Sequence, residues 1–147
     1  MIIRNTEGRG LARLKKYINQ LASDRVFVGV PRSANGARGN AMIAFVHEFG
    51  SIANNIPERS FLRSTVLEQA DKYAKIVMQK IPEAIKAGTN ARDAYSMLGT
   101  IAMNDVKLKI ASGDFAALAP ATIRRKKSSK PLIDTGNLRQ SISYEIK

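Results

Sequence analysis

Two stretches of helical periodicity set the framework of this chain. Residues 62–80 carry apolar side chains at steps of three and four. Residues 91–110 repeat the pattern, with Tyr95, Leu98 and Ala102 on one face. Apolar side chains at that spacing line one side of an α-helix. The sequence therefore predicts two long helices, and each needs a surface against which its apolar side can be buried.

Proline, asparagine and glycine mark the expected limits of these helices. Pro82 should end or kink the first helix, because proline has no backbone N–H to donate. Asn90 is placed to cap the start of the second helix, and Gly113 to stop it. Gly99 lies inside the second helix, where glycine costs about 1 kcal/mol relative to alanine. We therefore expect another segment to pack closely at Gly99.

Shorter elements are predicted on both sides of the long helices. Residues 25–30 are rich in β-branched and aromatic side chains, and residues 141–147 alternate apolar with polar ones, so both stretches predict strands. Residues 41–49 predict a short helix that ends at Gly50. Residues 9–22 predict a further helix.

This order of elements predicts an α+β fold. We expect a small, mostly antiparallel sheet packed against two long helices and shorter helices. The 147 residues suit one domain, residues 1–147. Mobile loops are expected near residues 31–40, which are rich in turn-forming residues, and near residues 113–131, with a turn of helix at about residues 122–126.

The helix predicted at residues 9–22 is amphipathic and basic. Leu11, Leu14, Ile18 and Leu21 recur at helical spacing, while lysine and arginine occupy the other side. Three interpretations are open: a surface helix with one buried stripe, a helix that docks a partner, or a helix lying on a membrane surface. The last lacks a tryptophan or phenylalanine as an anchor. No apolar run approaches the roughly 18 residues of a membrane span, so no membrane partner is expected.

The excess of positive charge lies toward the two ends of the chain. The net charge is +12, of which residues 1–40 hold eight Lys/Arg against two Asp/Glu and residues 112–147 hold seven against three. Such an excess indicates an anionic partner or an acidic protein surface. The densest run is a candidate contact for DNA or an acidic partner, or a solvated loop: Arg124, Arg125, Lys126, Lys127 and Lys130.

The residues that most resemble catalytic signals are incomplete. The chain has no cysteine, and its single histidine, His47, cannot supply the second ligand of a zinc-protease helix. Asp134-Thr135-Gly136 matches the core of an aspartic-protease motif, but only eleven residues follow Gly136, too few for the strands of that fold. Because no phosphate-binding glycine loop is present either, we expect no catalytic residue, no metal site and no cofactor, and not an enzyme.

Two groups of segments, taken together, resemble a known family. The first runs from Val28-Gly29-Val30-Pro31 through His47-Glu48-Phe49-Gly50 to the stretch Ile56–Arg63. The second runs from Leu118-Ala119-Pro120 through residues 129–136 to Leu138, Ile142 and Tyr144. Their order and spacing are similar to those of the phage virion-morphogenesis and tail-completion proteins, including the Mu-like neck proteins. Ser60 departs from the pattern, because the family usually has a second proline there.

The resemblance implies a structural virion protein rather than an enzyme. It would lie at the head–tail junction or the top of the tail, after assembly in the host bacterial cytoplasm. It would form a homo-oligomeric ring, with six copies to match the tail, that connects the tail to the head. Its partners would be other neck, tail-terminator or head-connector proteins, with weak contact to passing DNA. Tail completion, tail termination and adaptor roles all remain open, and a small basic nucleic-acid-binding protein is the alternative.

A ring needs two different patches on each copy, and arginine and aromatic side chains favour interface centres. We therefore expect Glu48–Arg63 and the Pro131–Leu138 loop to lie at or near contacts between copies, with internal stabilisation of the fold as the alternative. The residues concerned are His47, Glu48, Phe49, Arg59, Phe61, Arg63, Leu132, Asp134 and Leu138.

Overall fold

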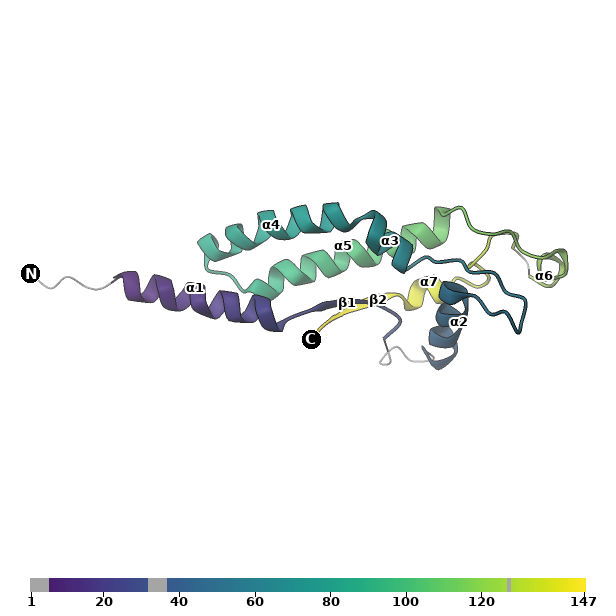
Figure 1. Ribbon diagram of the computed structural model, residues 1–147, viewed down its shortest axis with the longest axis horizontal. Coiled ribbons are helices and arrows are strands. Elements are labelled where there is room, and N and C mark those ends of the chain that lie inside the picture. Colours follow the sequence, from purple (N-terminus) through teal and green to yellow (C-terminus); the bar gives the residue numbers. More distant parts are fainter. Residues whose placement is uncertain (1–5, 32–36, 127) are drawn as a thin grey trace, which may run out of the picture.

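Helix α5 (Ala91–Ser112) runs through the middle of the fold. The computed structural model, shown in Figure 1, describes residues 6–31, 37–126 and 128–147. The predicted cap is confirmed, because the Asn90 side chain accepts a hydrogen bond from the backbone N–H of Arg92 at 3.0 Å. Small residues along the buried side of α5 let its neighbours approach closely: Ala91, Ala94, Gly99 and Ala102.

A two-stranded antiparallel sheet packs against α5. Strand β1 (Val26–Gly29) pairs with strand β2 (Ser143–Ile146), with Val26 opposite Ile146. The close packing expected at Gly99 is confirmed, since a Cβ atom there would lie 2.3 Å from the Tyr144 ring. The fold class is therefore α+β, with a small antiparallel sheet against a helical layer, as the sequence predicts.

Helix α4 (Ala70–Ala87) lies along α5, as Figure 1 shows, and the short helix α3 (Arg63–Glu68) precedes it. The prediction of one continuous helix is wrong at Gln69, where the two helices part. Of the two outcomes predicted at Pro82, an end of the helix is wrong, because α4 continues to Ala87. Pro82 is exposed, so water can satisfy the carbonyl group that loses its donor. The helix ends instead at Gly88, whose φ of 69° suits glycine.

Helix α1 (Thr6–Ser23) extends away from the sheet along the long axis of the molecule (Figure 1). The Tyr17 hydroxyl donates a hydrogen bond to the Thr89 carbonyl, and the Tyr95 hydroxyl donates to the Leu21 carbonyl at 2.9 Å. The interpretation of α1 as a helix with one buried apolar stripe is wrong. Among the side chains of α1 that the structure describes, Tyr17 is buried and Leu21 is half-buried, whereas Leu11, Leu14 and Ile18 are exposed.

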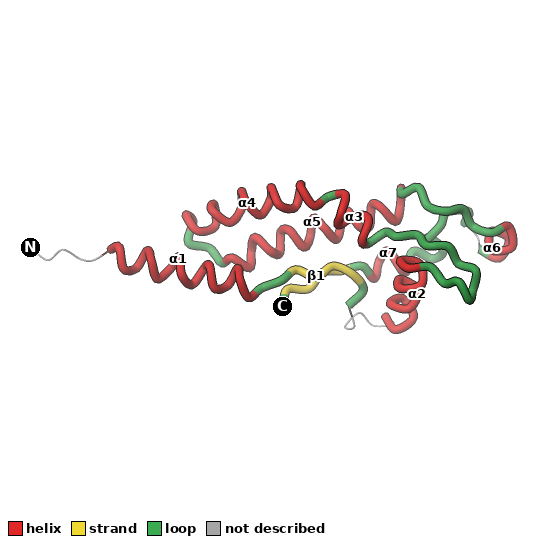
Figure 2. Tube along the Cα trace, in the orientation of Figure 1, coloured by secondary structure: helices red, strands yellow, loops and turns green. Residues whose placement is uncertain are grey.

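The remaining helices are short and lie toward the other end of the molecule: α2 (Ala37–Phe49), α6 (Pro120–Arg125) and α7 (Asn137–Ser141). Figure 2 shows the long loops gathered there, around α2 and α6. Helix α2 ends before Gly50, whose φ is 74°, as predicted. Of the loop expected near residues 31–40, residues 37–40 are helical and residues 32–36 lie outside the described ranges.

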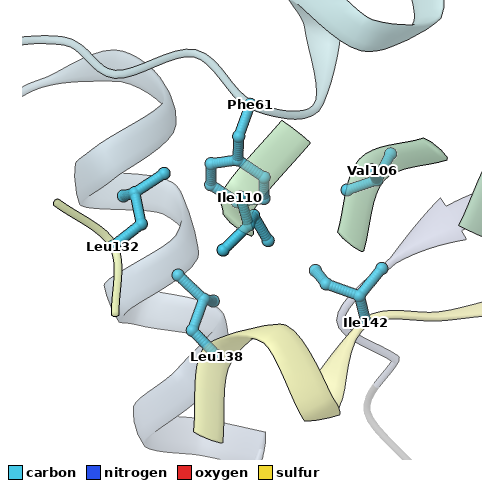
Figure 3. Close-up of a cluster of buried hydrophobic side chains, with 6 residues drawn as sticks. All are labelled: Phe61, Val106, Ile110, Leu132, Leu138 and Ile142. Atoms are coloured by element: carbon cyan, nitrogen blue, oxygen red, sulfur yellow. The ribbon is translucent and has the colours of Figure 1, made fainter. Parts of the chain in front are cut away.

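The core lies where the loops meet α5. Figure 3 shows its six buried side chains, which come from the loop before α3, from α5, and from the C-terminal segment: Phe61, Val106, Ile110, Leu132, Leu138 and Ile142. Residues from both motif regions therefore share one core. Among the described residues, no helix is long and apolar enough to cross a membrane.

Candidate protein-interaction site

The Glu48 carboxylate joins the end of α2 to the start of α3. It accepts hydrogen bonds from the backbone N–H groups of Phe61 at 3.0 Å, Leu62 at 2.9 Å and Arg63 at 2.9 Å. The Ser60 hydroxyl donates to it at 2.7 Å. A helix start leaves backbone N–H groups without partners, and Leu62 has no side chain that can cap them. Glu48 supplies that cap from another part of the chain.

The environment of Glu48 favours its charged form. Burial alone would raise the pKa of this carboxyl, but the hydrogen bonds from Leu62, Arg63 and Ser60 outweigh burial and hold the pKa below its usual value. The Arg63 guanidinium adds a contact of 3.1 Å from Nε to the Glu48 carboxylate. Glu48 is therefore a charged, buried centre of the fold.

Arg59 secures a second loop. Its guanidinium donates to the Ala116 carbonyl at 2.7 Å and to the Ala117 carbonyl at 3.0 Å, and the side chain is buried. Its backbone N–H donates to the His47 carbonyl at 2.7 Å. Arg59 thus ties the segment after α5 to the end of α2.

The second motif also shapes the fold from inside. Leu132 has a φ of 62°, which is uncommon for a residue with a side chain, and its side chain is buried in the core. Gly136, with a φ of 83°, precedes α7 and lets Leu138 enter the same core. These turns explain why Pro-Leu-x-Asp-Thr-Gly-x-Leu works as one structural unit.

Five of the nine predicted interface residues are therefore internal. Glu48, Arg59, Phe61, Leu132 and Leu138 are buried within the chain, where their side chains stabilise the fold. That the two loops lie at or near contacts between copies stays a prediction. The residues Phe49, Arg63 and Asp134 are exposed and His47 is half-buried, so these four remain available near the surface.

Helix α2 and the turn after it present an apolar surface of which the sequence analysis named only Phe49. We call it the α2 patch, and its members are all exposed by two-fifths or more: Met42, Ile43, Phe45, Phe49 and Ile52. The rings of Phe45 and Phe49 lie 4.9 Å apart, and the Arg63 guanidinium lies 4.8 Å from the centre of the Phe49 ring. The signal was present in the sequence, because residues 41–46 contain no polar side chain.

The basic run divides on folding. Arg124 and Arg125 are exposed on α6, and Lys130 is exposed beyond it. Lys126 is half-buried, and burial lowers the pKa of its ammonium group, although Asp134 acts in the opposite direction. Lys126 is therefore less accessible to a partner than Arg124, Arg125 and Lys130, and Lys127 lies outside the described residues.

His47 is a pH-sensitive point between these parts. Its Nδ1 atom is buried and has no hydrogen-bond partner. Burial and the nearby charges of Arg59 and Lys126 lower its pKa below 6.5. The unfolded chain therefore binds a proton at a higher pH than the folded chain does, and stability falls as the pH drops below 6.5.

This dependence of stability on pH gives a testable result for a His47→Leu variant. We expect its free energy of unfolding to change less than that of the wild type between pH 7.5 and pH 5.5, as measured by urea denaturation. The chain has one histidine, so no other imidazole confuses the comparison. Equal slopes for both proteins would contradict this account of His47.

The surface of the chain is large for its mass. A compact protein of 16.1 kDa exposes about 7,400 Å², whereas this chain exposes 10486 Å². When the eleven residues outside the described ranges are left out of both figures, the exposed area is about 8,700 Å² and the expected area about 7,000 Å², so an excess of about 1,700 Å² remains. A standard interface buries about 800 Å² per partner, so the excess corresponds to two such patches.

No family model, curated protein or solved structure matched the chain. The resemblance to the phage proteins therefore rests on the two motif regions alone. Among the described residues, no group of three or more acidic, histidine or cysteine side chains is arranged to hold a metal ion.

Proposed function

We propose that this chain is a structural subunit of a tailed-phage particle, which assembles as a homo-oligomeric ring at the head–tail junction. Its role is that of a neck or tail-completion protein that connects the tail to the head. The observation that carries the proposal is the combination of excess surface with exposed apolar side chains on α1 and α2. Monomeric proteins rarely expose contiguous apolar patches larger than a few hundred Å².

The two motif regions support the same proposal in a different way. Their buried residues fix the position of α2 relative to α3 and α7 through Glu48, Phe61 and Leu138. A subunit of a ring needs a rigid framework for its contact surfaces. The motif residues thus hold the α2 patch in place, while Phe49 and Arg63 belong to the surface itself.

A Phe45→Asp variant tests the proposed function. We expect it to lose at least a hundredfold in its ability to restore infectious particles to a phage that lacks the gene. Its thermal stability should stay close to that of the wild type, because Phe45 is exposed and surface changes usually alter stability by about 0.5 kcal/mol or less. The matched control is Met78→Asp, an exposed apolar position on α4 outside the α2 patch, which should restore particles normally.

A nucleic-acid-binding role is the second candidate, because Arg124 and Arg125 are exposed on α6, near one end of the molecule, and Lys130 is exposed as well. A binder should hold duplex DNA tightly, with an affinity that falls steeply as salt rises. A neck protein should bind it weakly, because DNA has to pass through the ring. Tight binding that an Arg124→Ala/Arg125→Ala variant abolishes would favour the second candidate.

A further inference from the structure

Two apolar surfaces lie apart on the molecule. The α1 stripe, defined as Leu11, Leu14 and Ile18, is exposed on the helix that extends from one end. The α2 patch lies toward the other end, beyond the sheet (Figure 1). One chain therefore cannot cover its own α2 patch with its own α1 stripe, and each surface needs a partner from outside.

We propose that the α1 stripe of one copy packs onto the α2 patch of the next copy. This inference rests on the proposed homo-oligomer and names the surfaces that build it. Such a contact joins two different patches, so a pair of copies keeps one free α1 stripe and one free α2 patch, and the assembly continues until the ring closes.

The spacing of the α1 stripe fits a helix that lies against an apolar surface. Leu11, Leu14 and Ile18 stand at positions i, i+3 and i+7, which is the usual arrangement of anchor residues in helix docking. The α2 patch offers two phenylalanine rings and an arginine at its edge, the side-chain types favoured at interface centres.

Charge favours this pairing over contact between two α1 helices. Residues 6–23 contain four Lys/Arg and one Asp/Glu, a net charge of +3. Residues 37–49 contain one arginine and one glutamate, a net charge of zero with His47 neutral. Two α1 helices side by side would place like charges together, whereas α1 against α2 avoids that repulsion.

The exposed area of the chain also favours a second copy as the partner of the α2 patch. The five members of the α2 patch expose on the order of 500 Å², given that large aromatic side chains bury 150–250 Å² each. The excess surface of the chain corresponds to two standard patches. The α1 stripe and the α2 patch, one of each on every copy, would be the centres of these two patches.

Disulfide cross-linking tests the contact cleanly, because the chain has no cysteine of its own. We would prepare the full chain as Leu11→Cys and as Phe45→Cys, mix the two variants and oxidise them. The expected product is a dimer of one copy of each, at least ten times more abundant than in a mixture of Met78→Cys with Phe45→Cys. Each variant alone should give little dimer, because the cysteines of two identical copies would lie on like surfaces, which do not contact each other.

Each other outcome overturns the inference. Abundant dimers from Leu11→Cys alone or from Phe45→Cys alone would show that like surfaces meet. Absence of the mixed dimer, while light scattering finds the wild-type chain oligomeric, would reject this contact and leave the proposed ring intact. Absence of the mixed dimer from a chain that is also monomeric would reject the contact too. In that case the proposed function is decided separately by whether particles assemble without the gene.

Discussion

Replacing Glu48 with glutamine should lower the free energy of unfolding by about 3–5 kcal/mol. The change keeps the shape of the side chain but exchanges one acceptor oxygen for a donor. Three backbone N–H groups and the Ser60 hydroxyl point at these two oxygens, so donors would then face donors. For a domain of this size, the midpoint of thermal unfolding should fall by about 10 °C. Calorimetry or circular dichroism measures both effects.

Glu58→Gln is the matched control. Glu58 also contacts Arg63, at 2.6 Å, but its side chain is half exposed, and exposed ion pairs contribute at most about 1 kcal/mol.

Because the folded chain holds the pKa of Glu48 below 4.5, the contribution of Glu48 to the free energy of unfolding should be complete above that pH and disappear as the pH falls further. The gap between wild type and Glu48→Gln should therefore narrow in acid. Equal stabilities of the two glutamine variants at neutral pH would contradict the role given to Glu48.

Replacing Gly99 with alanine should destabilise the protein by about 2 kcal/mol. Alanine favours a helix by about 1 kcal/mol over glycine, but its Cβ atom would lie 2.3 Å from the Tyr144 ring. Overpacking of this kind typically costs about 1–3 kcal/mol, and more when backbone has to move. The strand that carries Tyr144 would have to shift away from α5. Urea denaturation at neutral pH measures the loss.

Gly10→Ala makes the comparison decisive, because a Cβ atom at Gly10 meets nothing within 4 Å. The same substitution should there stabilise the protein by up to about 1 kcal/mol. Adding Tyr144→Ala to Gly99→Ala should cost little beyond Tyr144→Ala alone, since the ring that causes the clash is gone. Simple addition of the two losses would show that the clash is not the cause.

Local signals predicted the elements that depend on local chemistry. The Asn90 cap, the end of α2 at Gly50 and the close approach at Gly99 all follow from what one residue can or cannot do. The two strands followed from their composition and alternation. The break at Gln69 was missed, because it depends on what lies beside the helix rather than on its own residues.

The roles of the motif residues could not be read from the sequence in the same way. Arginine, phenylalanine and glutamate suit an interface and a buried network equally well, and only long-range contacts separate the two. Arg59 reaches Ala116 and Ala117, which lie 57 and 58 residues away along the chain. Glu48 meets residues 12 to 15 positions later. The α2 patch, which is exposed instead, was not predicted. The length of residues 41–49 was used to predict a helix, but the absence of polar side chains from residues 41–46 was not used to predict an exposed apolar surface.

The measurement that tests the central claim most directly is electron microscopy of phage particles made without this gene. A neck or tail-completion subunit should leave full heads and finished tails that fail to join, or tails of the wrong length. Restoring the wild-type gene should correct the defect, and Phe45→Asp should not. Normal, infectious particles in the absence of the gene would contradict the proposed function.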